Sequence, residues 1–118
     1  MFSFSRLFGS SENQVSAQEA YDLLQTKGKK ALILDVRTEG EYHGGMGHIG
    51  GSKLIPLQQL PQRLSKISKY KKQQILVICA SGARSASAVR LLQQSGFENA
   101  RNISGGMTAW LRADLPLK

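Results

Sequence analysis

The sequence predicts an α/β fold in which a mostly parallel sheet is covered by helices on both faces. Two short, continuous apolar runs, at residues 31–34 and 75–78, are typical of buried strands, and they alternate with stretches of helical periodicity. The length of 118 residues, with 41% hydrophobic and 20% charged residues, is ordinary for a globular domain with a substantial core. We therefore assign residues 1–13 to an N-terminal lead-in and residues 14–118 to a single domain.

The beginning of the domain is expected to form a helix followed by a strand. Residues 10–14 are polar and indicate an irregular lead-in. Ser16 and Glu19 have the spacing of a capping box, so the helix should begin directly after Ser16 and end near Gly28. The four apolar residues 31–34 are too few for a helix and predict a buried strand.

The middle of the domain should contain short elements separated by loops. Residues 38–42 can form one helical turn, whereas glycine is too frequent in residues 44–51 for regular structure. A short strand at residues 53–55 is ended by Pro56, and apolar residues then recur at helical spacing from Leu57 to Ile67. This part therefore contributes one strand and one helix.

The last third should contain a long helix, a strand and a short helix. After the strand at residues 75–78, apolar spacing predicts a helix from Ala86 to a glycine cap at Gly96. Residues 97–103 are expected to form the last strand. After a glycine turn, residues 107–111 open a final helix with its tryptophan facing the core.

The net charge of +8 is concentrated in one segment. Between Tyr42 and Phe97 there is no Asp or Glu, and the remainder of the chain balances eight cations with eight acids. The cations of this segment are Lys53, Arg63, Lys66, Lys69, Lys71, Lys72, Arg84 and Arg90. Such a field attracts anions, so the expected partner is a small anionic substrate or an acidic protein. A solvated helix face is the alternative for residues 63–72, and nucleic acid is not expected because no binding motif is present.

The N-terminus and the cysteine content bear on the cellular compartment. The apolar residues of the first nine are too few for a signal-peptide core, and no apolar run approaches the ~20 residues of a membrane helix. This phenylalanine-rich segment is expected to pack on the domain, with an interfacial anchor or a docking segment as alternatives. The single cysteine excludes an internal disulfide and a multi-cysteine metal site, and it favours a reducing, cytoplasmic location.

The residues that carry chemistry are expected in the loop 79–85. Its first residue, Cys79, follows a buried strand and precedes a helix. A thiol there faces backbone N–H groups and the positive end of a helix dipole, and both stabilise a thiolate or a bound anion. A lone cysteine after an apolar strand is otherwise more often an inert buried residue, so the rest of the loop decides between the two.

The other loop residues favour a reactive thiol. Gly82 permits backbone angles that are closed to other residues, so the loop can curl tightly. Small residues leave consecutive N–H groups free to point inward as an anion nest; they are Ala80, Ser81 and Ala83. Arg84 can place a planar cation over the pocket, and Ser85 can cap the helix through its hydroxyl. Cys79 is therefore predicted to be a nucleophile with a lowered pKa.

The spacing of cysteine and arginine discriminates between two chemistries. Protein tyrosine phosphatases and related arsenate reductases use five residues between the two, which makes a loop wide enough for a tetrahedral oxyanion. Only four residues separate Cys79 from Arg84. The smaller loop better fits the outer sulfur of a persulfide, and phosphoryl or arsenate chemistry is a distant alternative.

At this point the chain resembles the single-domain rhodanese-like sulfurtransferases. The resemblance is carried by residues 34–37 with 41–42, 47–52 and 55–57, by the loop 79–85, and by residues 105–110. It covers about residues 14–117. It implies a compact α/β domain with a five-stranded, mostly parallel sheet, and it implies no metal and no organic cofactor.

The resemblance also implies a double-displacement reaction. Cys79 would take the outer sulfur of thiosulfate or another donor as a persulfide, and a nucleophilic acceptor, cyanide or a thiol, would then remove it. The implied substrate-binding residues are Ala80, Ser81, Gly82, Ala83, Arg84 and Ser85, with Arg37 contributing positive potential. Because Ala80 and Ser81 are small and neutral, the pocket is left open, and the donor need not be thiosulfate. The alternative is a persulfide relay or docking module that serves an acidic partner protein.

Four further polar residues have structural interpretations. Asp35 and Arg37 are expected to form an ion pair or loop clamp rather than to act in catalysis. His48 is expected to bond to the backbone and order the glycine-rich loop rather than to act as a general base. Glu41 is expected to pair locally with a basic group.

Overall fold

A computed structural model describes residues 13–27 and 30–118 of the chain. The elements follow one another in the order β1 (Gln14–Val15), α2 (Ala17–Lys27), β2 (Ala31–Asp35), α3 (Glu39–Tyr42), β3 (Lys53–Leu54), η3 (Leu57–Tyr70), β4 (Gln74–Ile78), α4 (Ala83–Gln94), β5 (Ala100–Ile103) and α5 (Gly106–Arg112). Strands and helices alternate along the described chain, as the sequence predicts for an α/β fold.

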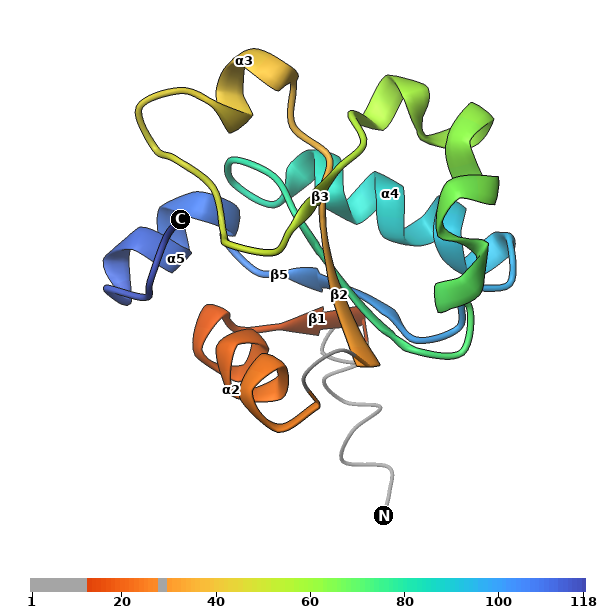
Figure 1. Cartoon of the computed structure of the whole chain (residues 1–118), viewed down its shortest axis with the longest axis horizontal. Helices are drawn as coiled ribbons and strands as arrows, with labels where there is room; N and C mark the ends of the chain where they lie inside the picture. The colour runs from red at the N-terminus through yellow and green to blue at the C-terminus, as the bar shows by residue number, and fades with distance from the viewer. Residues whose placement is uncertain (1–12, 28–29) are drawn as a thin grey trace.

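The five described strands form one sheet in the order β1-β5-β4-β2-β3 (Figure 1). All of its pairings are parallel, and that between β2 and β4 runs from Ala31 opposite Gln74 to Asp35 opposite Ile78. The predicted five-stranded parallel sheet is thereby confirmed. Because the strands are parallel, their carboxyl ends meet at one edge, where ligands bind in such sheets.

The sheet separates the core into two layers. Side chains alternate along β4, so that Ile75 and Val77 pack with residues of α4 and η3, whereas Leu76 and Ile78 pack with residues of α2 and α5. Figure 1 shows α2 and α4 on opposite sides of the sheet. Cys79 continues the alternation and belongs to the layer beneath α4.

The predicted capping box is present at the start of α2. The N–H of Glu19 donates to Ser16 Oγ at 3.0 Å, and the N–H of Ser16 donates to Glu19 Oε1 at 2.8 Å. Two N–H groups that would otherwise lack a partner are satisfied, and the helix begins at Ala17. It runs to Lys27, while the predicted stop, Gly28, lies outside the described residues.

Two strand predictions are wrong at their boundaries. Gln14, expected to be irregular, forms β1 and lies opposite Asn102 of β5. A two-residue strand shows no periodicity, so only its pairing reveals it. The last strand is Ala100–Ile103 instead of 97–103, because the N–H of Phe97 donates to the Leu92 carbonyl at 2.9 Å and closes the end of α4.

Two helix predictions also need correction. Leu57–Tyr70 is a 3₁₀ helix, not an α-helix, and its backbone is interrupted at Arg63. Pro61 lies inside it and has no N–H to donate, which disfavours a continuous α-helical ladder. The helix after the cysteine loop begins at Ala83, three residues earlier than expected, so Arg84 lies in its first turn.

No helix in residues 13–27 or 30–118 is long and apolar enough to cross a membrane. The phenylalanine-rich segment lies outside the described residues, and its packing on the domain stays a prediction. In the final helix, Met107 and Trp110 are buried, as expected for core residues.

Candidate functional site

Cys79 lies at the carboxyl end of the central strand β4, directly after Ile78. Its side chain is almost fully buried. The end of β2 lies beside it, because Asp35 pairs with Ile78 and the N–H of Val36 donates to the Ile78 carbonyl at 3.0 Å. The parallel sheet thus brings the loop 79–85 and the residues that follow β2 to one edge.

The sulfur of Cys79 caps helix α4. The N–H of Gly82 donates to Sγ at 3.0 Å and that of Ser85 at 3.3 Å, while the N-cap residue, Gly82, supplies no side-chain bond. Gly82 has a φ of 109°, which glycine adopts without strain, so the loop curls back over the sulfur. N–H groups point inward as expected, but capping by the Ser85 hydroxyl is wrong, because Ser85 lies within the first turn and the sulfur occupies the capping position.

These surroundings favour the thiolate. Burial by itself raises the pKa of the Cys79 thiol, but the Ser85 hydroxyl and the backbone N–H groups of Ser85, Gly82 and Ser81 outweigh it, so the pKa lies below its ordinary value. The positive end of α4 acts in the same direction. A thiol in this position can act as a nucleophile.

Helix α5 sets the direction of the peptide groups in the loop. The N–H of Met107 donates to the carbonyl of Cys79 at 2.8 Å, and that of Thr108 donates to the carbonyl of Ala80 at 3.1 Å. Gly106 permits this approach, since a Cβ there would collide with the Cys79 carbonyl. With these carbonyls held by α5, the N–H groups that follow are free to turn toward the sulfur.

Arg84, in the first turn of α4, forms a bidentate ion pair with Glu41 of α3. The distance from Nη1 to Oε1 is 2.7 Å and that from Nη2 to Oε2 is 2.8 Å. The hydrogen bond from Arg84 and that from the Thr38 backbone hold the pKa of Glu41 at about 2. Glu41 was expected to find a basic partner nearby in the chain, but Arg84 is 43 positions away.

Arg37 is completely buried and joins three segments. Its guanidinium donates to Asp35 Oδ2 at 2.8 Å, to the Gly47 carbonyl at 2.8 Å and to the Glu41 carbonyl at 3.3 Å. These bonds tie the end of β2 to α3 and to the glycine-rich loop. The contacts are those of a loop clamp.

His48 lies within the glycine-rich loop. Its Nδ1 is 2.9 Å from the Tyr42 carbonyl oxygen, and its ring stacks on that of Tyr42 with 3.7 Å between centroids. The Tyr42 hydroxyl in turn donates to the Ser52 carbonyl at 3.1 Å. These contacts agree with the expectation that His48 orders the loop rather than acting as a base.

Asn102 of β5 is a residue of the site that sequence reasoning missed. It is 5% exposed, its Oδ1 accepts from the Ser85 hydroxyl, and its Nδ2 donates to the Gly82 carbonyl at 3.2 Å. The available signal was a polar side chain in a strand whose neighbour Ile103 is apolar. Burial of such a side chain requires partners, and here they belong to the cysteine loop.

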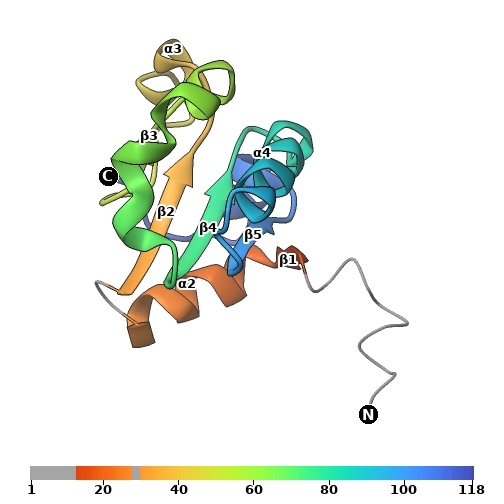
Figure 2. The same ribbon diagram turned by 90° about the vertical axis from the view of Figure 1, so that its right-hand side faces the viewer.

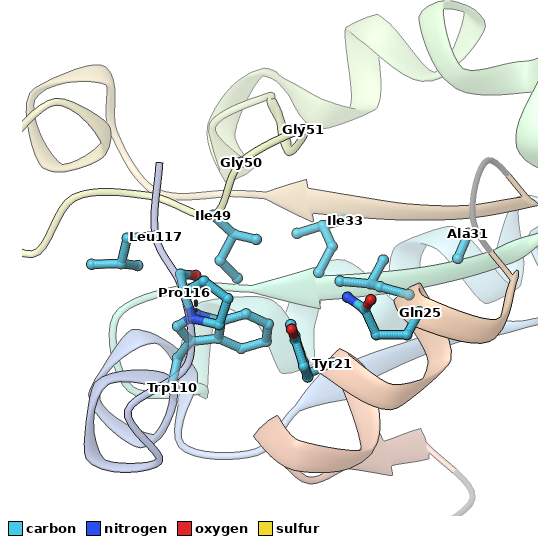
Figure 3. Close-up of a pocket in the computed structure, with 11 residues that line it drawn as sticks. Tyr21, Gln25, Ala31, Ile33, Ile49, Gly50, Gly51, Trp110, Pro116 and Leu117 are labelled. Carbon is cyan, nitrogen blue, oxygen red and sulfur yellow. Dashed lines mark hydrogen bonds between the residues drawn. The ribbon is translucent and has the colours of Figure 1, made fainter.

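A separate cavity of about 520 Å³ lies on the other face of the sheet (Figure 3). Its wall includes Tyr21, Ile33, Ile49, Trp110, Pro116 and Leu117. The Trp110 indole donates to the Pro116 carbonyl at 3.0 Å and meets the Tyr21 ring edge-on. No residue of the loop 79–85 lines this cavity, so it is distinct from the thiol site.

Four of the five lysines in the acid-free segment lie away from Cys79, whereas Lys53 lies opposite Leu34 near the carboxyl end of β2. η3 descends to the edge of the sheet where β4 begins, opposite the edge with the carboxyl ends (Figure 2). The exposed lysines at this end are Lys66, Lys69, Lys71 and Lys72. Because β4 carries the chain across the sheet before Cys79, these four lysines and Arg84 lie at opposite ends of the strands. Among residues 13–27 and 30–118, no group of His, Cys, Asp and Glu could hold a metal ion.

Comparison with known proteins identifies relatives of the whole described domain. The model of the rhodanese-like domain family matches residues 16–113. A sulfurtransferase of Allochromatium vinosum is 37% identical over 73% of this chain and 77% of its own length. Thiosulfate sulfurtransferase 16, a chloroplastic protein of Arabidopsis thaliana, is 33% identical over 90% of this chain and 92% of its own length.

Other similarities concern a longer protein and a solved structure. A putative sulfur carrier protein of Bacillus subtilis is 34% identical over 86% of this chain, which is 55% of that protein. The crystal structure of a rhodanese-like domain protein from Staphylococcus aureus has a TM-score of 0.74 and 35% identity, covering 90% of this chain and 98% of that one. Several relatives are longer than this chain, and for four of them the match spans between 19% and 62% of their length.

Proposed function

The chain belongs to the rhodanese-like sulfurtransferase family, and from that premise we propose that it transfers a sulfane sulfur through a persulfide on Cys79. The observation that supports this most is the buried sulfur that accepts N–H bonds from Gly82 and Ser85 at the positive end of α4. Such donors stabilise the negative charge of a thiolate and equally that of a persulfide. A reducing compartment, the cytoplasm, would keep this thiol free.

In the first step the Cys79 thiolate attacks the outer sulfur of a donor such as thiosulfate. A bond forms between Sγ and that sulfur, the sulfur–sulfur bond of thiosulfate breaks, and its electron pair leaves with sulfite. The product is an anionic persulfide, and the total charge is unchanged. The backbone of Ala80, Ser81, Gly82, Ala83, Arg84 and Ser85 is proposed to bind the donor and then the persulfide.

In the second step a nucleophilic acceptor, cyanide or a thiol, removes the outer sulfur. With cyanide, a carbon–sulfur bond forms, the persulfide bond breaks, and thiocyanate leaves while the thiolate is restored. The outer sulfur lies about 2 Å beyond Sγ, which brings it closer to solvent than the buried thiol. A persulfide therefore makes accessible what the free thiol keeps buried.

Arg84 is proposed to bind the anionic donor. Arg84 lies in the first turn of α4, the turn that the Cys79 sulfur caps. Its side chain is partly open to solvent, but it is already paired with Glu41. A donor must therefore share or displace that carboxylate. We propose that Glu41 limits the charge that Arg84 offers, so that anion binding at this site is moderate.

Mass spectrometry of the intact protein tests the persulfide directly. After incubation with thiosulfate, a polysulfide or an organic thiosulfonate and removal of the donor, we expect a gain of one sulfur on Cys79, which cyanide then removes. Cys79→Ser is the matched control, because a hydroxyl can still accept the N–H bonds that cap α4. Absence of the adduct with every donor, or an equal adduct on Cys79→Ser, rejects the proposal.

The position of the lysine cluster supports a second function, a persulfide relay for an acidic protein. Lys66, Lys69, Lys71 and Lys72 are exposed and lie at the edge of the sheet opposite Cys79, so a docked partner would leave the thiol accessible. A flexible segment of that partner would then reach the persulfide.

A binding measurement separates this relay from an independent enzyme. Replacement of the four lysines by glutamine should abolish capture of an acidic acceptor protein, and raised salt should do the same. Persulfide formation from thiosulfate should remain as in the original protein. Undiminished capture by the four-lysine variant contradicts the relay, and so does an equal loss of capture when Lys53 and Arg90 are replaced instead.

A further inference from the structure

The buried amide of Asn102 has an orientation that the loop dictates. The Gly82 carbonyl can only accept a hydrogen bond, so the amide nitrogen must face it, as it does at 3.2 Å. The amide oxygen must then face Ser85, whose hydroxyl donates to it. Asn102 therefore presents an acceptor, and not a donor, to the residue that touches the sulfur.

Three acceptors surround the single proton of the Ser85 hydroxyl. They are Asn102 Oδ1, the Gly82 carbonyl at 3.2 Å and Cys79 Sγ at 3.3 Å. The Gly82 carbonyl also receives the N–H of Ala86 at 3.2 Å and the amide of Asn102. Within the described residues, Asn102 Oδ1 accepts a hydrogen bond only from the Ser85 hydroxyl. While Cys79 is a thiol, Ser85 therefore donates its proton to Asn102, and the thiol can itself donate to Ser85.

Ionisation of Cys79 reverses the demand on Ser85. A thiolate can only accept, so the hydroxyl must turn its proton from Asn102 to the sulfur. If it does not turn, an oxygen lone pair faces a negative sulfur at 3.3 Å. If it turns, the buried Asn102 oxygen loses its donor, which is unfavourable.

We propose that Asn102 is a positioning residue that acts through Ser85. By competing for the hydroxyl proton, it destabilises the anionic state of the Cys79 sulfur relative to the thiol. The inference rests on the proposed persulfide chemistry and deepens it, since the Cys79 thiolate is the nucleophile of its first step. No group is transferred, because the proton stays on Ser85 Oγ and only the hydroxyl rotates. The thiol proton itself leaves to solvent.

The charged groups around Cys79 are the same in every variant needed for a test. Arg84 faces it from α4 together with Glu41 of α3, and the Asp35–Arg37 pair lies at the end of β2. A change at Asn102 therefore alters the acceptor behind Ser85 without changing a charge. Leucine has nearly the shape of asparagine and no acceptor.

Titration of the thiol tests the proposal with opposite signs. In Asn102→Leu the hydroxyl is free to donate to the sulfur, so the apparent pKa of Cys79 should fall by about one unit. In Ser85→Ala the donor is lost, and the pKa should rise by a similar amount. The rate of alkylation by iodoacetamide, measured against pH, reports both, and it should change about tenfold on the acidic side.

The double variant and a matched control complete the experiment. In the Ser85→Ala background, Asn102→Leu should have no further effect on the titration, and Ser85→Thr should restore the original behaviour. Asn99→Leu, an exposed change near the start of the same strand, should leave the pKa unchanged. If Asn102→Leu does not fold, Asn102→Ala serves in its place.

The result that overturns the proposal is a rise or no change of the thiol pKa in the folded Asn102 variant. That outcome would mean that Asn102 only supports the loop, whose N–H donors weaken when it is lost. Alkylation needs no sulfur donor, so the titration is decided even if no persulfide forms. A failure of the proposed function and a failure of this inference are therefore distinguishable.

Discussion

Two arginine–carboxylate pairs lie at the same edge of the sheet and differ in their surroundings. In the Asp35–Arg37 pair both side chains are 0% exposed, and the guanidinium also bonds to the Gly47 and Glu41 carbonyls. In the second pair, Arg84 is 37% and Glu41 33% exposed. The first pair is part of the packed interior, and the second is partly open to solvent.

The same type of ion pair therefore occurs in a buried and in a partly exposed environment at one site. Removal of one member of a buried pair leaves an uncompensated charge in the core, whereas an exposed pair exchanges partners at little cost. We therefore interpret Arg37 as a structural residue that fixes the loop, and Arg84 as a residue that can exchange its partner. Glu41 connects the two, since its carbonyl accepts from Arg37 and its carboxylate from Arg84.

The largest expected effect follows from breaking the buried pair. Arg37→Met should lower the free energy of unfolding by about 3–5 kcal/mol, because Asp35 stays buried without its partner. Denaturant unfolding followed through the fluorescence of Trp110 measures it. Arg112→Met, at an exposed arginine, is the control and should change stability by less than about 0.5 kcal/mol. Equal stability of the two variants would contradict the structural role of Arg37.

Breaking the open pair on its basic side should affect binding more than folding. Arg84→Met keeps the aliphatic stem and removes the charge, so the KM for thiosulfate should rise roughly tenfold, as expected for loss of one charge-assisted hydrogen bond. The unfolding free energy should change by less than about 1 kcal/mol. An unchanged KM would show that Arg84 does not bind the donor.

Removal of the acidic partner should have a smaller effect of opposite sign. Glu41→Gln keeps the capping box with Thr38 but frees the charge of Arg84, so the KM for thiosulfate should fall roughly two- to fivefold. Glu39→Gln, in the same helical turn, removes an equal charge without touching Arg84 and should have no effect. A rise of KM in Glu41→Gln would instead make Glu41 a residue that orients Arg84 for binding.

The smallest expected effect is the contribution of the open pair to stability. The pKa of Glu41 is lowered from 4.5 to about 2 in the folded protein, so its contribution is present above pH 4.5 and is lost as the pH falls toward 2. Because the pair is partly exposed, this contribution should be less than about 1 kcal/mol. Unfolding at several pH values, compared with Glu41→Gln, measures it; identical pH profiles would show that the pair stabilises nothing.

Local sequence patterns were sufficient to predict most of the fold that positions Cys79. The apolar run at β4, the glycine in the loop and the spacing of Cys79 and Arg84 depend on neighbours in the chain, and the structure has the predicted parallel sheet with Cys79 at its carboxyl edge. The capping box at Ser16 is equally local. Such features are encoded within a few residues, which is why sequence reasoning finds them.

The missed features depend on contacts between distant segments. Nothing near Glu41 in the chain indicates Arg84 as its partner, and nothing near Asn102 indicates Ser85. The lysines were expected to attract anions to the cysteine loop because they share an acid-free segment with it, but β4 carries the chain across the sheet between Lys72 and Cys79. Position along the sequence is therefore a poor guide to position in a parallel fold.

The hydrogen bonds between α5 and the cysteine loop bear on how the length of that loop can change. The carbonyls of Cys79 and Ala80 are in register with Met107 and Thr108, and Gly106 leaves no room between them. One inserted residue would widen the loop to the spacing of a phosphatase, but it would also shift this register. A change of loop length is therefore expected to require a matching change at the start of α5.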